Sequence, residues 1–512
     1  MLSPPAPMKI GFISLGCPKN LVDSEVMLGL ARQAGHTLTT DASDADVLVV
    51  NTCAFIDSAK QESIDAILEM AAVKRAGRDE AERGGGAPAS EELGGVQGSP
   101  PFKRRTRLVV TGCLAERYRD RLQREIPEID VLLGTNEVPE IVRAIEGDGD
   151  GRAGQGNGRA EVPLHVPAKL FRREHGDAAA RPAAGIVEKP LPTYIYDAKT
   201  PRLLTTPTHY AYMKIAEGCD YTCAFCIIPK LRGAYRSRPI DSLVEEAGKL
   251  VQRGVREIIL ISQDTTFYGV DRGERGALAR LLRRLNAVDG LEWIRLLYLY
   301  PTTIDDSVMG AMAECEKVCK YVDLPLQHAS AAVLKRMKRP GTGTSYRRLL
   351  DRIRTQVPGV ILRTTFIVGF PGETDGDFAE LRAFARDVRF DHLGVFTYSH
   401  EEGTSAHALP DDVPARVKAA RRRALMETQR TLVARLNRER IGTRVRLVVD
   451  GKAAEHELVL KGRMEGQAPD IDSVIYLSDC DPAALAPGSF LEAEIVGARD
   501  YDLVARPFDS CP

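Results

Sequence analysis

The stretch Tyr210–Cys226, with the sequence YAYMKIAEGCDYTCAFC, decides the fold of the centre of the chain. Its apolar half, Tyr210–Ala216, predicts a buried β-strand, and three cysteines, Cys219, Cys223 and Cys226, follow on one short loop. Three thiolates on a tight loop suit three irons of a [4Fe-4S] cluster and leave the fourth iron open for a non-protein ligand. Zinc with a remote fourth ligand is the weaker alternative, because structural zinc sites are closed by four protein ligands.

Around this stretch the sequence alternates strands with helical patterns over residues 205–440. Further strands are predicted at Glu257–Ile261, Trp293–Tyr298, Tyr321–Leu324, Val360–Val368 and His392–Tyr398. Six strand–helix units predict a parallel (β/α) barrel, incompletely closed, with its chemistry at the carboxyl ends of the strands. A long, arginine-rich helix that ends near residue 440 closes this domain.

The segment 8–146 has the same rhythm and predicts an open parallel sheet domain. Cys17, Cys53 and Cys113 each directly follow one of its first three predicted strands. Because ligands collect at the carboxyl edge of an open α/β sheet, a second tri-thiolate cluster site is expected there despite the long separations in sequence. The alternative is three unrelated buried cysteines, since cysteine packs well in protein cores.

Three other segments have a different composition. Residues 75–105 are rich in Gly, Ala, Glu and Pro and predict a disordered insertion, and residues 147–204 predict a flexible linker. Residues 441–510 contain five short strand patterns separated by Gly, Pro and Asp, which predict a small antiparallel β-barrel of the oligonucleotide-binding type.

The overall composition is that of a globular protein of several domains. The chain has 512 residues, 44% of them hydrophobic, and its 70 Lys and Arg nearly balance its 71 Asp and Glu. This balance gives no whole-chain attraction to nucleic acid. The sequence has no signal-peptide pattern and no apolar run long enough to span a bilayer, so a cytoplasmic location without membrane contact is expected.

The cysteine spacing from Cys219 to Cys226 resembles the signature of the radical S-adenosylmethionine (SAM) superfamily. One family of this superfamily is the methylthiotransferases, and three motifs of the chain resemble the amino-terminal domain of that family: SLGCPKN (Ser14–Asn20), NTCAF (Asn51–Phe55) and TGCL (Thr111–Leu114). The tail resembles a TRAM domain. The resemblance therefore covers nearly the whole chain apart from the predicted insertion and linker.

This resemblance implies two [4Fe-4S] clusters and SAM as cofactors. One SAM would donate a methyl group. Another, cleaved with one electron from a low-potential donor, would yield a 5′-deoxyadenosyl radical, so that a methylthio group is inserted at an unactivated C–H bond. Phe225 matches the family's aromatic position beside the adenosyl group. Gly372, in the segment VGFPGET (Val368–Thr374), lies in a region that lines the SAM pocket in such enzymes, although a plain turn is the alternative.

Family members modify either a tRNA adenosine (MiaB-like members) or the β-carbon of an aspartate of ribosomal protein S12. From Ile441 onward the chain has 7 Lys and Arg against 13 Asp and Glu, which favours a basic protein over tRNA as partner. Acidity that serves solubility alone is the alternative. The segments LISQDTTFYG (Leu260–Gly269) and LPLQH (Leu324–His328) also resemble the ribosomal-protein-modifying members. We therefore expect ribosomal protein S12 as the substrate.

One functional alternative and two basic regions are also considered. A non-catalytic iron–sulfur factor that binds the ribosome or RNA does not explain why both triads lack a fourth cysteine. Basic residues near the central cysteines form either a phosphate-binding patch or internal ion pairs; they are Lys230, Arg232, Arg236 and Arg238. The run Arg421–Arg423 is expected on a solvated helix face.

Overall fold

The computed structural model describes residues 6–84, 106–147, 191–453 and 456–508. The chain divides into two compact units. The N-terminal unit comprises Met1–Leu203 together with the short segment Lys230–Gly233, and the barrel unit comprises Leu204–Pro229 and Ala234–Pro512. Within the described residues, no helix combines the length and the apolar character that crossing a membrane requires.

The N-terminal unit is built on a five-stranded parallel sheet with the order β2-β1-β3-β4-β5. Its strands are β1 (Lys9–Ser14), β2 (Thr37–Thr39), β3 (Val47–Thr52), β4 (Arg107–Gly112) and β5 (Val131–Leu133). The accompanying helices are α1 (Pro18–Gln33), α2 (Asp57–Gly84), α3 (Cys113–Glu125) and α4 (Ile141–Glu146). Strand β3 is buried along its whole length, as its continuous VLVVNT sequence suggests for a central parallel strand. The predicted open sheet is therefore confirmed, with β2 as an additional edge strand.

The structure differs from the prediction at the start of the insertion and at the end of the linker. Helix α2 continues to Gly84, past the predicted start of the insertion at residue 75, because its Ala, Arg and Glu residues are good helix formers even without an apolar repeat. The rest of the insertion and residues 148–190 of the linker lie outside the described residues. The last part of the predicted linker is not free: Tyr196 is buried, and the Leu203 N–H donates to the Glu25 carbonyl of α1.

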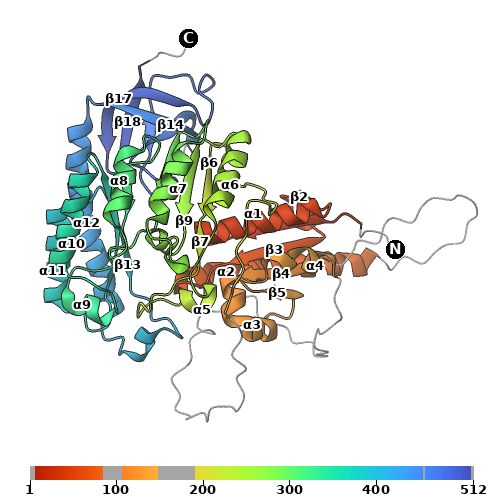
Figure 1. Cartoon of the computed structure of the whole chain (residues 1–512). Helices are drawn as coiled ribbons and strands as arrows, with labels where there is room; N and C mark the ends of the chain where they lie inside the picture. The colour runs from red at the N-terminus through yellow and green to blue at the C-terminus, as the bar shows by residue number, and fades with distance from the viewer. Residues whose placement is uncertain (1–5, 85–105, 148–190, 454–455, 509–512) are drawn as a thin grey trace, which may run out of the picture. The chain divides into compact units, whose positions relative to one another are not determined.

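The barrel unit contains six parallel strands in two three-stranded sheets, β10-β9-β6 and β11-β12-β13 (Figure 1). They are β6 (Tyr210–Lys214), β9 (Glu257–Ile261), β10 (Trp293–Leu296), β11 (Tyr321–Asp323), β12 (Ile361–Val368) and β13 (His392–Thr397). An isolated parallel bridge between Ile294 and Val318 links the two sheets, and no pairing joins β6 to β13 among the described residues. The prediction of an incompletely closed barrel is confirmed.

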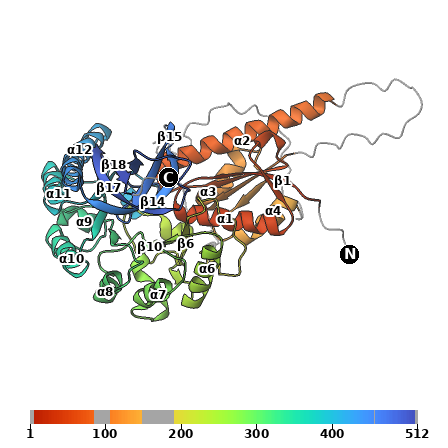
Figure 2. The same ribbon diagram turned by 90° about the horizontal axis from the view of Figure 1, so that it is seen from above.

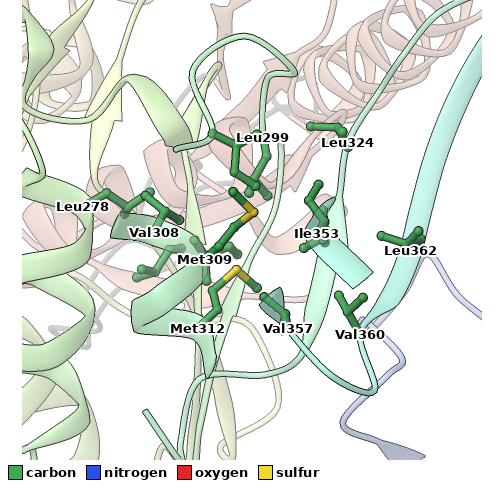
Figure 3. Packing of buried hydrophobic residues seen from close by; sticks show 14 of the residues in the cluster. Leu278, Leu299, Val308, Met309, Met312, Leu324, Ile353, Val357, Val360 and Leu362 are labelled. Atoms are coloured by element: carbon green, nitrogen blue, oxygen red, sulfur yellow. The ribbon is translucent and has the colours of Figure 1, made fainter. Parts of the chain in front are cut away.

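Helices cover the outside of this arc of strands (Figure 2). They are α6 (Ile240–Gln252), α7 (Ala277–Asn286), α8 (Asp306–Glu314), α9 (Ala331–Arg336), α10 (Gly343–Gln356), α11 (Asp375–Val388) and α12 (Ala415–Arg440). Helix α7 illustrates how an apolar face packs a helix on the strands. Four leucines recur at helical spacing and are all buried, while the arginines of the helix lie between them; the leucines are Leu278, Leu281, Leu282 and Leu285. Figure 3 shows part of the resulting core, where Met309 and Met312 of α8 pack beside Ile353 and Val357.

The tail forms a closed five-stranded barrel with the order β14-β15-β16-β18-β17. Its strands are β14 (Arg444–Ala453), β15 (His456–Met464), β16 (Ile475–Leu477), β17 (Phe490–Arg499) and β18 (Asp502–Pro507). The pairs are antiparallel except for β16 with β18, which is parallel. The predicted small barrel is confirmed, and the single parallel pair is the one departure from an all-antiparallel barrel.

Three acidic residues of the tail contact the amino-terminal ends of the strands of the central barrel, and two of them, Asp450 and Asp472, have largely buried side chains. Asp450 lies 2.9 Å from His209 Nε2 and 2.8 Å from Arg463 Nε, and Arg463 Nη2 lies 2.8 Å from Glu257 at the start of β9. Asp472 accepts a hydrogen bond from Tyr321 and is paired with Arg363 and His392, and Asp470 accepts from Tyr210 and Tyr212.

These pairs change the interpretation of the tail's negative charge. Part of it neutralises cations inside the chain, and this portion can neither attract a basic partner nor serve solubility. Even on the outer surface, Glu492 and Glu494 are paired with Arg444 and Arg506. The acidic excess is thus a weaker argument for a basic substrate than the sequence alone suggests.

Candidate functional site

The three central cysteines lie on the loop that follows β6 and the short strand β7 (Ala216–Glu217). Backbone hydrogen bonds hold this loop to two others: the Ala224 N–H donates to the Met337 carbonyl at 2.8 Å, and the Ala224 carbonyl accepts from the Ala406 N–H at 2.7 Å. The loop also turns on itself through a Cys226 N–H to Cys223 carbonyl bond. The cysteines are therefore at the carboxyl end of a barrel strand, as predicted, and on a fixed backbone.

The chemistry of the loop fits a cluster that carries positive charge on its irons. Burial raises the pKa of Cys219 to about 11, with Cys223 adding to the shift. Burial raises the pKa of Cys226 to about 12, and both Cys223 and Cys219 contribute. Three partly exposed thiols on one loop form a set of soft ligands that a metal cluster would stabilise as thiolates.

A hydrogen-bond hub lies beside the loop at the end of β9. Asp264 is 1% exposed and accepts bonds from Tyr221, Thr303, and the backbone and hydroxyl of Thr266. Tyr221, between the first two cysteines, stacks on Tyr300 with ring centroids 4.0 Å apart. The hub fixes the conformation of the cysteine loop from the neighbouring strands.

Phe225 contacts a small apolar cluster, and Gly372 follows one member of that cluster, Phe370, by two residues. Phe225 packs against a group that includes Phe370 and Tyr398. Gly372 has a φ of +75°, which favours glycine, and its N–H donates to Asp412 while its carbonyl accepts from Arg336. The backbone groups of Gly372 are thus engaged within the chain, and contact of either residue with SAM stays a prediction.

The second triad gathers at the carboxyl edge of the N-terminal sheet. Cys17 follows β1 and caps α1, Cys53 follows β3, and Cys113 follows β4 and begins α3. Strands β1, β3 and β4 are neighbours in the sheet, so their ends lie side by side. Two of the three sulfurs stand at helix N-termini, where the helix dipole favours negative charge.

Cys17 and Cys113 lie close enough to Cys53 to affect the pKa of its thiol. Burial raises the pKa of Cys53 to about 12, and Cys113 and Cys17 both add to the rise. A Cβ added at Gly16, whose φ is +92°, would lie 2.7 Å from Cys53 Cβ and 3.1 Å from its sulfur. The backbone before Cys17 is therefore packed directly on Cys53, and this close approach requires glycine.

Arg232 is a charged side chain that contacts this triad. It belongs to α5 (Ile228–Arg232), and the segment that contains it is part of the N-terminal unit. Its guanidinium is paired with Asp23 at 2.6 Å and donates to Cys113 Sγ at 3.5 Å. Arg238, in the barrel unit, is paired with the buried Glu246. Internal ion pairs, and not a phosphate-binding patch, thus account for these two arginines.

Three features of these sites are not visible in the sequence. Arg339 donates to Cys223 Sγ at 3.9 Å, and no motif indicated it. Asp264 lies in the segment Leu260–Gly269, whose sequence indicated only the subfamily and not that this carboxylate accepts several hydrogen bonds. Arg421, expected on a solvated face, is buried and paired with Glu373 of the VGFPGET segment.

Within the described residues, no three His, Cys, Asp or Glu side chains are arranged to hold one metal ion. A four-iron cluster does not need such convergence, because each thiolate binds a different iron.

Models of three protein families match the chain. The Radical SAM superfamily matches residues 213–385, the Uncharacterized protein family UPF0004 matches residues 9–83, and the TRAM domain matches residues 441–507. Together with the barrel and its cysteine loop, these matches define a radical SAM enzyme that carries an added N-terminal sheet domain and a C-terminal TRAM barrel.

Full-length relatives narrow this class. The chain is 45% identical to a protein of Solibacter usitatus over 97% of this chain and 94% of the relative, and 44% identical to one of Koribacter versatilis over 98% and 96%. Both are named ribosomal protein uS12 methylthiotransferase RimO. The chain therefore belongs to the RimO family of methylthiotransferases.

Among solved structures, the chain is similar to the radical S-adenosylmethionine methyltransferase TsrM from Kitasatospora setae. The identity is 14%, the TM-score is 0.49, and the match covers 76% of this chain and 72% of the other.

Proposed function

We propose that this protein inserts a methylthio group at the β-carbon of an aspartate of ribosomal protein uS12 and uses two separately held [4Fe-4S] clusters to do so. The observation that carries the function is identity of about 45% over nearly the full length of relatives named for this activity. The protein is a radical SAM methylthiotransferase of uS12 that uses an iron–sulfur cluster and SAM. A tRNA substrate and a non-catalytic role are not favoured.

The six cysteines divide between the two clusters in this proposal. Cys219, Cys223 and Cys226 hold the cluster whose open iron binds SAM, with Phe225 and Gly372 toward the adenosyl group. Cys17, Cys53 and Cys113 hold the second cluster, whose open iron serves sulfur delivery. When bound, the first cluster supplies the electron that cleaves SAM, which requires a low-potential electron donor as a further partner.

The chain's own residues prepare these sites before any cofactor binds. The hydrogen bonds from Ala224 to Met337 and from Ala406 to Ala224 fix the central loop between two neighbouring segments. The Asp264 hub orients Tyr221 within the loop at 2.9 Å. In the N-terminal unit, the adjacent strand ends bring the sulfurs together with no need for a long flexible loop. Such preorganised ligands lower the entropic cost of cluster binding.

Iron loading tests the division of the cysteines. Anaerobic reconstitution of the full chain is expected to give about eight irons, as two four-iron clusters. Alanine at Cys219, Cys223 and Cys226 together should leave about half of the iron and abolish SAM cleavage. Alanine at Cys17, Cys53 and Cys113 should also leave about half, spare SAM cleavage and block methylthiolation.

A matched control is the buried pair Cys315 and Cys319, which lies in the barrel core. Alanine at these positions should not reduce the iron content. If the N-terminal triple variant keeps the full iron content, or still methylthiolates at the wild-type rate, those three cysteines are not ligands.

The substrate is tested by offering both candidates to the same enzyme. Mass spectrometry of uS12, or of small subunits that contain it, should show a gain of a methylthio group on one aspartate, while bulk tRNA should stay unmodified. Methylthiolation of tRNA at a higher rate than of uS12 would overturn the assignment.

A further inference from the structure

Each cysteine triad has one buried arginine that donates to a cysteine sulfur. In the N-terminal unit, Arg232 Nη2 lies 3.5 Å from Cys113 Sγ. In the barrel unit, Arg339 Nη1 lies 3.9 Å from Cys223 Sγ. The two arginines are 3% and 8% exposed. Because a guanidinium is costly to bury, its position beside a thiol calls for a physical explanation.

Arg232 is held in place by groups of the N-terminal unit. Its Nη1 donates to Asp23 Oδ2 at 2.6 Å, and its Nη2 donates to Asn20 Oδ1 at 3.2 Å as well as to the sulfur. Asp23 and Asn20 both lie on α1, which begins directly after Cys17. The planar fork of the guanidinium therefore reaches the helix behind Cys17 and the sulfur of Cys113 at once.

Arg339 is held by a different set of partners. Its Nη2 donates to the Pro325 carbonyl at 2.6 Å, and its guanidinium carbon lies 4.2 Å from the centre of the Tyr300 ring. Tyr300 is the ring on which Tyr221 of the cysteine loop stacks. Within the described part of the chain, Arg339 forms no ion pair with a carboxylate, so the Cys223 sulfur, once it binds a cluster as a thiolate, is the anionic group that this guanidinium contacts.

We propose that Arg232 and Arg339 are positioning residues that raise the reduction potentials of the two clusters, one arginine for each. A hydrogen bond to a ligating sulfur and a nearby positive charge stabilise the reduced cluster, which has one more negative charge than the oxidised cluster. The proposal rests on the cysteine assignments of the proposed function. A purely structural role, in which the arginines only tie segments together, is the alternative.

The experiment measures each cluster alone. The full chain with alanine at Cys219, Cys223 and Cys226 holds only the N-terminal cluster, and the variant with alanine at Cys17, Cys53 and Cys113 holds only the other. Arg232→Gln and Arg339→Gln are placed in both backgrounds, and the reduced fraction is followed by electron paramagnetic resonance during a potentiometric titration. A background that binds no iron would count against the cysteine assignments and not against the arginines.

We expect Arg232→Gln to lower the ratio of reduced to oxidised N-terminal cluster about tenfold at a fixed potential, which is ~59 mV for one electron. The barrel cluster should be unchanged. Arg339→Gln should have the reciprocal effect, so each variant is the control for the other. Arg232→Lys, which keeps the charge but loses the fork, should recover part of the shift.

A second variant separates the electrostatic role from the structural one. Asp23→Asn removes the carboxylate partner of Arg232 but keeps the arginine, which can still donate its hydrogen bond to the Cys113 sulfur. Loss of this negative charge should raise the potential of the N-terminal cluster, opposite in sign to Arg232→Gln. Unchanged potentials in both glutamine variants, or shifts of the same sign in Asp23→Asn and Arg232→Gln, would overturn the proposal.

Discussion

Replacing Glu257 by glutamine is expected to lower the free energy of unfolding of the barrel unit by about 3–5 kcal/mol. The Glu257 side chain is 1% exposed, and its oxygens lie 2.7 Å from Arg295 Nε and 2.8 Å from Arg463 Nη2. Glutamine keeps the shape of the side chain, so no cavity forms and the loss is electrostatic. Arg463 keeps Asp450 as a partner, whereas Arg295 has no second carboxylate partner among the described residues and keeps the neutral Glu465 carbonyl.

Trp293 provides the assay, because it is the only tryptophan of the chain. It packs edge-on against Phe490 of the tail barrel, with ring centroids 4.9 Å apart. Urea unfolding followed by its fluorescence therefore reports on the same interface that Glu257 stabilises. The matched control is Glu245→Gln, which breaks a half-exposed pair with Lys249 on α6 and should change the free energy of unfolding by only about 0.3–0.5 kcal/mol.

The pH dependence of this difference has a definite sign. Burial opposes ionisation of Glu257, but Arg463 and Arg295 together hold its pKa below the ordinary value. The stabilisation is therefore complete above the unfolded-state pKa of ~4.3 and is lost as the pH falls through the lower folded-state pKa. Two results would refute this reasoning. The first is a shift of the urea midpoint by Glu257→Gln that is no larger than the shift by Glu245→Gln. The second is a difference in the free energy of unfolding between wild type and Glu257→Gln that already shrinks from pH 8 to pH 6.

Three further predictions concern other parts of the structure. Gly16→Ala should remove about half of the reconstituted iron, because the new Cβ would collide with Cys53, whereas Gly254→Ala, with a φ of +98° and nothing within 4 Å, should keep all of it. Asp472→Asn should increase hydrogen exchange of β11 and β16, because this carboxylate accepts from Tyr321 and pairs with Arg363; unchanged exchange would contradict this. Removal of the clusters by chelation should increase exchange at residues 219–226 but not in helix α7, and equal increases in both would count against local stabilisation by the cluster.

Most of the strands, and the positions of six cysteines just after strand ends, could be predicted from the sequence because each depends on a local pattern. Glu257–Ile261 is a short β-branched run with clear ends, and the structure has the same bounds. The placement of Cys17, Cys53 and Cys113 at one edge of the sheet followed from one rule about parallel sheets, since each comes directly after a strand.

Contacts between charges far apart in sequence could not be predicted in this way. Nothing near Arg232 indicates that it reaches Asp23, and nothing near Asp472 indicates Arg363. The acidic excess of the tail was visible as a count, but a count does not distinguish a solvated carboxylate from one buried beside an arginine. The continuation of α2 to Gly84 was missed for a related reason: helix propensity without an apolar repeat leaves no periodic signal.

The buried charges between the tail and the central barrel also limit how far members of this family can exchange parts. A chimaera joined near Ile441, with the TRAM barrel of a tRNA-modifying relative, would place foreign side chains against Arg295, Arg363 and Tyr321, all of which need acidic or carbonyl acceptors from the tail. The activity of such a chimaera would depend first on whether the foreign TRAM barrel packs against the central barrel, and only then on its choice of substrate. A graft that asks whether the TRAM barrel contributes to choice of substrate therefore has to retain Asp472 and the Glu465 carbonyl, which contact the central barrel.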